Sequence, residues 1–436
     1  MDTHRRVAIT GIGMVTPVGN DIETTWDALL AGKSGCAGIT LFDASGFPVR
    51  IAAEVKGFRA EDVDVPRKTL KLTNRSHRFA LAAAEQALRD AGIRPTPATA
   101  SRWCCAVGAG MMTSSYSELA ETHQHSAASG DLDAGLLLSD PAANDPLVFC
   151  RSQASAGLAL VTSSFGIEGY ATAVHTACAS GGQALGTALK LIRRGSADFA
   201  LAGGFDSMVS PIGISGFVLL SALSTDNESP ERASRPFDLT RNGFVLGEGA
   251  GSLVLEEWTA ARRRGARIYA ELAGDGNSLS SYRITDSPPD GDGPIQAMRA
   301  ALTDARATPD EVDYLNAHGT STGMNDRSET AAVKAVFGAG VERVSVSSTK
   351  STMGHLIAAA GAVEGAVCAL AIQRSEMPIN ANLVERDPEC DLNIVTGSPR
   401  HQRVRVAISN SFGFGGSNSC IVLRNPSEVD GAGAIA

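Results

Sequence analysis

The chain repeats one order of secondary-structure patterns in its two halves. Residues 87–110 contain a helix end, a proline-containing loop and a strand that ends on glycine, and residues 301–320 follow the same plan. A glycine loop feeds a strand at 247–257 and again at 413–425. Strand and helix patterns alternate throughout, which is typical of α/β proteins. The sequence therefore predicts one α/β unit that occurs twice, with the boundary near 258–266.

This repeat divides the chain into an N-terminal half over 1–258, a C-terminal half over 259–425 and a disordered tail over 426–436. The length of 436 residues is enough for one large duplicated domain. The composition is that of a globular protein, and no apolar run is long enough to cross a bilayer. The formal charge of −9, with no basic block, argues against nucleic acid. We expect neither a membrane nor a nucleic acid as partner.

The eight cysteines are scattered along the chain without a CxxC pair or a secretion signal. Disulfides are therefore not expected, and the cytoplasm is the expected location. The eight histidines form no cluster with metal-ligand spacing, so no metal site is expected.

Cys178 stands in a local context that a packing cysteine does not need. Residues 171–177 have the pattern of a buried strand, and from Ala184 apolar residues recur on one face of a helix that ends at Gly195. At such a strand-to-helix turn, free N–H groups and the helix dipole lower the pKa of a thiol. The glycines of the following Ser-Gly-Gly, 180–182, leave room for a substrate above the sulfur. The pattern predicts a nucleophile, and the alternative is a small buried thiol.

Two histidines stand at equivalent strand-to-helix junctions of the second half. His318 ends a strand in NAHGTST, and His355 begins a small-residue helix five residues after Lys350. Either histidine alone is as readily explained as a core residue satisfied by hydrogen bonds. The glycine loop SNSFGFGGSNS at 409–419 allows backbone N–H groups to approach a substrate oxygen. Together these features predict partners for a cysteine nucleophile.

Four motifs follow one another along the chain: TACASG, NAHGTST, SSTKSTMGHLIAAAGAVE and SNSFGFGGSN. In this order they resemble the β-ketoacyl-[acyl-carrier-protein] synthases, condensing enzymes of the thiolase superfamily. The resemblance runs from about residue 5 to 424, and the segments 211–225 and 234–251 resemble the elongating synthases, of the synthase II type, in particular. It implies a thiolase-like fold, in which a duplicated α/β unit forms a five-layer αβαβα sandwich.

The resemblance implies an acyltransferase that performs a decarboxylative condensation. An acyl chain moves from acyl carrier protein (ACP) to Cys178, malonyl-ACP loses CO₂, and the carbanion attacks the acyl-enzyme to give 3-oxoacyl-ACP. The pathway is fatty acid elongation or a fatty-acid-like pathway. No cofactor is implied, because the substrates arrive on the phosphopantetheine arm of ACP. The partners implied are ACP and a second copy in a homodimer, or a chain-length-factor-like subunit in a heterodimer.

The resemblance also assigns roles to individual residues. Cys178 is the acylated nucleophile, and His318 and His355 flank the malonyl thioester. Lys350 helps to fix the histidines, and Glu364 belongs to the buried polar network behind them. The other positions are the oxyanion hole (backbone N–H of Cys178 and Phe412), the gate (Phe412), the pantetheine and malonyl region (Thr320 and Thr322), the malonyl pocket (Phe217) and the acyl tunnel (Met111).

Departures from the family pattern leave the pathway open. Gly323 stands where proline is common, and MNDRSETAAVK and DPECDLNIV favour type II polyketide synthases. A ketosynthase subunit of a type II polyketide or polyene synthase is therefore the alternative. A degradative thiolase would need a second cysteine in 412–418, which contains none. A chain-length subunit would lack the nucleophile, and a plain scaffold leaves the Cys/His/His/Lys set unexplained. Acyl length, saturation, the cognate carrier protein and the role of residues 111–155 do not follow from the sequence.

Overall fold

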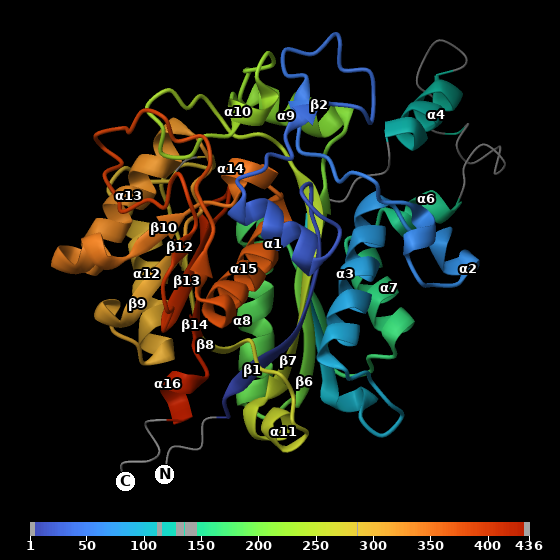
Figure 1. Ribbon diagram of the computed structural model, residues 1–436. Coiled ribbons are helices and arrows are strands. Elements are labelled where there is room, and N and C mark those ends of the chain that lie inside the picture. Colours follow the sequence, from blue (N-terminus) through green and yellow to red (C-terminus); the bar gives the residue numbers. More distant parts are fainter. Residues whose placement is uncertain (1–4, 111–115, 128–134, 136–145, 286, 431–436) are drawn as a thin grey trace.

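Ten strands form one continuous sheet in the computed structural model, which describes residues 5–430 apart from 111–115, 128–134, 136–145 and 286 (Figure 1). The strand order is β10-β9-β13-β14-β8-β1-β7-β6-β4-β5. The strands of the first half are β1 (Val7–Val15), β4 (Trp103–Ala109), β5 (Ala171–Val174), β6 (Phe199–Ser207) and β7 (Glu248–Glu257). Those of the second half are β8 (Ala270–Leu279), β9 (Val312–Asn316), β10 (Ser345–Ser347), β13 (Val406–Phe412) and β14 (Ser417–Arg424).

The two halves of this sheet have the same topology when each is followed outward from the centre. The first half runs β1-β7-β6-β4-β5, and the second runs β8-β14-β13-β9-β10. In both, the two inner pairs are antiparallel and the two outer pairs are parallel. The halves join where β1 pairs antiparallel with β8, through Ala8 with Glu271 and Ile9 with Ala270. The predicted duplication of an α/β unit is confirmed.

Helices make three further layers around the two half-sheets. In the middle, α8 (Ser180–Arg193) packs on β4 and β6 of the first half and on β8 and β14 of the second, and α15 (Ala360–Arg374) packs on β7 and β13. On the outer face of the first half, α3 (Arg75–Ala91) covers β1 and β7, and α7 (Ala156–Phe165) contacts β4 and β5. On the other outer face, α12 (Asp292–Ala305) covers β8 and β14 and packs against α13 (Gly323–Phe337). Figure 1 shows α8 and α15 side by side at the centre, which completes the predicted αβαβα sandwich.

Shorter elements connect these layers. They are α1 (Ile22–Leu30), α2 (Arg67–Leu70), α4 (Tyr116–Ser126), α6 (Pro146–Arg151), α9 (Pro211–Leu219), α10 (Pro230–Ala233), α11 (Trp258–Arg263), α14 (Lys350–Met353), α16 (Ser427–Asp430), β2 (Ala37–Gly38), β3 (Ile51–Ala52), β11 (Glu376–Met377), β12 (Arg400–His401) and the 3₁₀ turns η1 (Ala60–Asp62), η2 (Ala100–Arg102), η4 (Ala177–Ala179), η5 (Pro309–Glu311), η6 (Gly338–Arg343) and η7 (Ile357–Ala359).

Two expectations about the ends and the apolar segments need correction. Ile357–Arg374 is long and apolar enough to cross a membrane, although no such run was expected, but 89% of it is buried inside the protein. Apart from Glu364 and the last two residues, Gln373 and Arg374, its residues are apolar on every face, as a helix between two sheets requires. The tail expected to be disordered from residue 426 begins with α16, where Arg403 contacts Ser427 and Glu428.

Glycines allow the two central helices to touch backbone to backbone at their N-termini. A Cβ on Gly181 would lie 2.7 Å from the backbone N of Ala362, and one on Gly361 would lie 2.5 Å from that of Gly182. On its other side Gly181 lies against β4, since a Cβ on Gly108 would lie 2.5 Å from the Gly181 N. The sequence-based expectation that the glycines after Cys178 leave room for a substrate is therefore wrong. Atoms of the second half of the chain fill the space beside these glycines.

This contact predicts a stability loss for Gly361→Ala. The new methyl group overlaps the Gly182 backbone, and we expect the free energy of unfolding to fall by about 1–3 kcal/mol. Urea denaturation measures the change. Gly216→Ala is the matched control: it lies inside α9 with open space around its Cβ position. We expect it to be neutral or to gain up to about 1 kcal/mol, and equal effects of the two variants would contradict the close helix contact.

Candidate active site

Cys178 lies in the 3₁₀ turn η4, between the end of β5 and the start of α8, as predicted. The preceding residue, Ala177, has φ +50°, a left-handed conformation that costs a non-glycine residue free energy. This turn presents the sulfur at the N-terminal end of α8. The Cys178 side chain is buried, with 5% of the residue exposed.

The structure brings both predicted histidines to this sulfur. The Cys178 Sγ and one ring nitrogen each of His318 and His355 lie within 4.8 Å of one another. The His355 Nε2 is 3.0 Å from Sγ, and the two imidazole rings are 5.3 Å apart and nearly perpendicular. His318 follows β9 and His355 follows α14, so both come from the half of the chain that does not carry the cysteine.

A backbone hydrogen bond fixes the tautomer of His355. The Ile357 N–H donates to His355 Nδ1 at 3.2 Å, so the proton of a neutral ring is on Nε2, which faces the sulfur. Burial and the nearby charge of Lys350 hold the pKa of His355 well below its ordinary value, and the same causes act on the pKa of His318. Both imidazoles are therefore neutral, and His355 acts as a hydrogen-bond donor.

His318 is held by a carboxylate that sequence reasoning missed. The backbone N–H groups of His318 and Gly319 donate to Glu329 at 2.9 and 2.7 Å, and the Asn410 side-chain amide donates to the same carboxylate at 3.0 Å. Glu329 lies on the buried side of α13, eleven residues after the histidine, and its burial raises its pKa to about 7. The residues around it, 325–330, are all polar, so the sequence carries no signal that this carboxylate is buried.

Lys350 and Glu364 form a buried ion pair behind the histidines, where the resemblance placed them. Their side chains are 1% and 2% exposed, and Lys350 Nζ contacts Glu364 Oε1. The Lys350 charge lowers the pKa of Cys178 and of both histidines. It therefore favours a thiolate and neutral imidazoles together.

The pKa of Cys178 in this site differs from the sequence-based expectation. The pKa is raised to about 12, chiefly by burial and to a lesser extent by the charge of Asp206, although Lys350 and the backbone N–H of Phe414 oppose the rise. The sequence places the thiol at a helix N-terminus but gives no sign that the second half of the chain covers it. The resting cysteine is thus a thiol, and its proton has to leave during the reaction.

The backbone donor near the sulfur is Phe414, whereas the resemblance assigned Phe412. The N–H of the intervening Gly413 donates to the Ser417 carbonyl at 2.7 Å in the β13–β14 turn. The backbone N–H of Phe414, in the same turn, hydrogen-bonds to Cys178. The Phe412 ring packs edge-on against His318, with the ring centres 5.6 Å apart.

A cavity of about 300 Å³ opens onto these groups. Its walls include Thr320 and Thr322, whose hydroxyl oxygens are 2.9 Å apart. Phe217 is buried one layer behind the wall, where its ring contacts Phe244 and Phe414. Met111 lies outside the described residues. The remaining lining residues with a predicted role are Cys178, His318, His355 and Phe412.

The thiol and the two imidazoles also have the composition of a metal site. The 3.0 Å separation of Sγ and Nε2 is that of a hydrogen bond. The ammonium of Lys350 acts on all three groups and repels a second cation. The electrostatics of the site therefore favour a developing negative charge over a metal ion.

Comparisons with known proteins cover nearly the whole chain. The family model "Beta-ketoacyl synthase, N-terminal domain" matches residues 4–261, and "Beta-ketoacyl synthase, C-terminal domain" matches 269–384. The chain is 41% identical over 419 residues to a 3-oxoacyl-[acyl-carrier-protein] synthase 2 of Coxiella burnetii, with 96% of this chain and 98% of that protein covered.

Two solved structures extend the comparison to the fold. One is the structure titled "AntDE:AntF (apo): type II PKS acyl-carrier protein in complex with its ketosynthase bound to the hexaketide". The matching chain of that complex is 33% identical to this chain, with a TM-score of 0.86. The other is the ishigamide ketosynthase/chain length factor, with 34% identity and a TM-score of 0.85. In both, 97% of this chain and 99% of the solved chain are covered.

The buried neutral histidines predict a loss of stability in acid. The unfolded imidazole takes up a proton below its ordinary pKa of 6.5 and the folded one does not, so stability falls as the pH falls through that value. At pH 5.5, one unit below this pKa, each buried neutral histidine lowers the free energy of unfolding by about 1.4 kcal/mol. Urea denaturation at pH 7.5 and 5.5 should show a smaller loss for His318→Asn and for His355→Asn than for the wild type. Exposed His175→Asn is the control, and parallel pH dependences for all four proteins would contradict neutral histidines.

Proposed function

Because the chain belongs to the β-ketoacyl synthase family, we propose that it catalyses the decarboxylative condensation of an acyl-ACP with malonyl-ACP. The products are 3-oxoacyl-ACP and CO₂. The observation that carries this proposal is the contact of one sulfur with two neutral imidazoles from the opposite half of the chain, with the His355 Nε2 at 3.0 Å from Sγ.

In the first half-reaction the acyl group moves to Cys178. The sulfur attacks the thioester carbon, the pantetheine thiol leaves with the cysteine proton, and a new thioester forms on Sγ. The carbonyl oxygen carries negative charge in between and needs fixed donors. We assign the backbone N–H groups of Cys178 and Phe414 to this oxyanion hole, because both donate hydrogen bonds at the sulfur.

In the second half-reaction malonyl-ACP loses CO₂, and the electron pair of the broken bond is delocalised onto the thioester oxygen as an enolate. Two neutral N–H donors stabilise this charge without first giving up a proton. His355 is held as such a donor by Ile357, and His318 stands beside it on the backbone that Glu329 anchors. The enolate carbon then attacks the acyl-cysteine, the carbon–sulfur bond breaks, and the departing Cys178 thiolate takes up a proton to restore the resting thiol. These steps need neither a metal nor a redox cofactor, so we propose that the enzyme uses none.

The carrier protein is the proposed partner, and the cytoplasm is the proposed location. The similar type II ketosynthase is solved in complex with its acyl-carrier protein, which supports an ACP as the donor of both substrates. The cavity wall at Thr320 and Thr322 offers two hydroxyl groups for the amides of a pantetheine arm. We propose fatty acid elongation by a homodimer, in line with the synthase 2 relatives.

A specific observation favours a second candidate function. Both solved structures reported above contain ketosynthases, one of a type II PKS and one of a ketosynthase/chain length factor, and both are similar to the chain over 97% of its length. The chain is therefore also a candidate ketosynthase subunit of a type II polyketide synthase. An assay of the purified chain decides between the two functions. It supplies malonyl-ACP with acyl-ACPs of different length and unsaturation, and mass spectrometry identifies the products. Condensation by the chain alone favours elongation by a homodimer, and activity only with a chain-length-factor subunit favours the second function.

We predict that acyl-ACP adds one acyl mass to the protein, on Cys178. Cys178→Ala should form no acyl-enzyme, because the attacking sulfur is gone. Intact-protein mass spectrometry followed by peptide mapping measures both. Cys150→Ala, which removes the exposed cysteine, is the matched control and should acylate as the wild type does. A wild-type protein that stays unmodified by every acyl-ACP would refute the proposed function.

We also predict that His318→Ala and His355→Ala retain acyl transfer but lose decarboxylation. Each variant lacks one donor to the enolate oxygen, so the rate of CO₂ release from malonyl-ACP should fall by about 10²–10³-fold. Exposed His401→Ala is the control and should keep the wild-type rate. Unchanged CO₂ release in both site variants would show that the imidazoles do not stabilise the enolate.

A further inference from the structure

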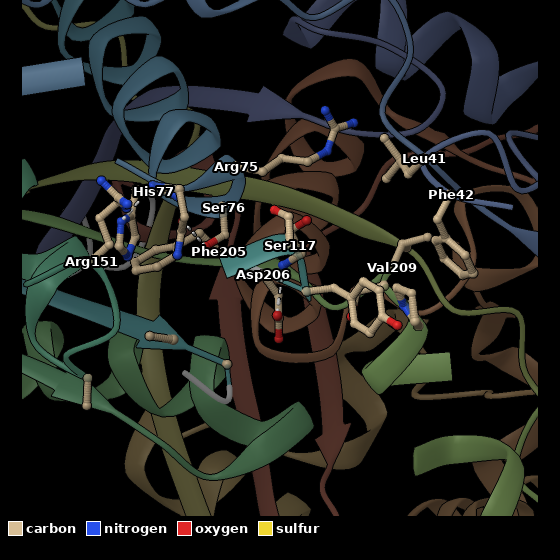
Figure 2. A pocket seen from close by; sticks show the side chains of 18 of the residues that line it. Leu41, Phe42, Arg75, Ser76, His77, Ser117, Arg151, Phe205, Asp206 and Val209 are labelled. Atoms are coloured by element: carbon tan, nitrogen blue, oxygen red, sulfur yellow. Dashed lines mark hydrogen bonds between the residues drawn. The ribbon is translucent and has the colours of Figure 1, made fainter. Parts of the chain in front are cut away.

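A buried carboxylate, Asp206, lies beside the nucleophile at the end of β6. Only 3% of the residue is exposed. Figure 2 shows it among the side chains that line a pocket of about 360 Å³, near Phe205 and Val209. The steps of the proposed condensation do not use this group, and none of the sequence motifs includes it.

Both oxygens of Asp206 hold backbone N–H groups. Oδ2 accepts from Ala358 at 3.1 Å, and Oδ1 accepts from Ser207 at 2.8 Å. The carboxylate also lies tightly against the end of β4, where a Cβ on Gly110 would lie 2.1 Å from Oδ2. Asp206 is thus fixed by the first half of the chain and holds the backbone of the second.

The backbone that Asp206 holds is next to the donor that sets the tautomer of His355. Ala358 directly follows Ile357, whose N–H bonds to His355 Nδ1. Ile357 has φ +48°, a strained conformation for a β-branched residue, so surrounding contacts have to maintain it. The 3₁₀ turn η7, which contains Ala358, has no side-chain cap of its own, so Asp206 supplies an acceptor for one of its N–H groups from another element.

We propose that Asp206 is a positioning residue of the condensation. By holding the Ala358 N–H it holds the turn at 357–358, and with it the Nε2–H of His355 aimed at Cys178. Asp206 can have this role only if the chain has the function proposed above. It does not touch the reacting atoms, and it acts through the backbone and through its charge.

The charge of Asp206 gives a readout that a purely structural role would not give. Burial raises its own pKa to about 7, and its negative charge raises the pKa of Cys178. Removal of the charge should therefore lower the pKa of the thiol. The other titratable and charged groups around the pair are His318, His355 and Lys350 at the sulfur, Glu248 with its partner Arg75 beside Asp206, and His77 across the pocket.

The test compares Asp206→Ala and Asp206→Asn with the wild type in two assays. In the first, kcat for decarboxylation of malonyl-ACP should fall by about 10–100-fold in Asp206→Ala, with KM within about twofold. Asp206→Asn keeps one oxygen acceptor and should fall in between. In the second, the pH midpoint of Cys178 alkylation by iodoacetamide should drop by roughly half a unit to one unit in both variants.

Asp275→Asn is the matched control, because Asp275 on β8 is a buried carboxyl that pairs with Lys190 of α8 and does not line the cavity of the site. It should keep the wild-type kcat and alkylation midpoint even if it is less stable. If Asp206→Ala does not fold, Asp206→Asn carries both measurements.

Two results would overturn the proposal. One is a kcat within twofold of the wild type in folded Asp206 variants. The other is a reduced kcat with an unchanged alkylation midpoint, since a general loss of stability would produce that result. A wild-type protein that forms no acyl-enzyme and releases no CO₂ would instead refute the condensing function itself, so the two failures are distinguishable.

Discussion

The contact between the N-termini of α8 and α15 determines the rest of the site. Glycine at 181, 182 and 361 lets the two backbones meet at a distance that no side chain would permit. Through this contact the thiol at the start of α8 comes within hydrogen-bond distance of His355, which precedes α15. The cysteine thereby shares one cavity with two histidines that follow it by more than a hundred residues in the sequence.

Burial at this junction explains the protonation states of the site. It keeps both imidazoles neutral and the resting thiol protonated, and it leaves Lys350 with Glu364 as a compensated pair behind them. Backbone N–H groups donate to the sulfur beside the His355 ring, and the backbone N–H of Ile357 orients that ring. Such donors are in place before any charge forms, which is how a protein stabilises an oxyanion without reorganisation at the moment of reaction.

The sequence predicted what is encoded locally. The duplicated α/β order, the cysteine at a strand-to-helix turn and His318 after its strand all follow from hydrophobic periodicity and glycine placement along the chain. His355, expected at a strand-to-helix junction, instead follows the short helix α14. The comparisons and the sheet topology confirm the family and the fold. Three features depend on how the C-terminal half packs against the N-terminal half. They are the space beside Gly181, the pKa of Cys178 and the identity of the backbone donor at the sulfur, Phe412 or Phe414. No local pattern encodes that approach, and Glu329 was missed for the same reason.

The matching topology of the two halves has an evolutionary consequence. Each unit carries a helix that starts at the junction, but one brings sulfur and the other brings imidazole. A single ancestral copy would have had to pair with its twin to enclose a reaction centre, and that centre would have been symmetric. In a single fused chain each position is free to diverge, so that a nucleophile occupies one half and hydrogen-bond donors occupy the other.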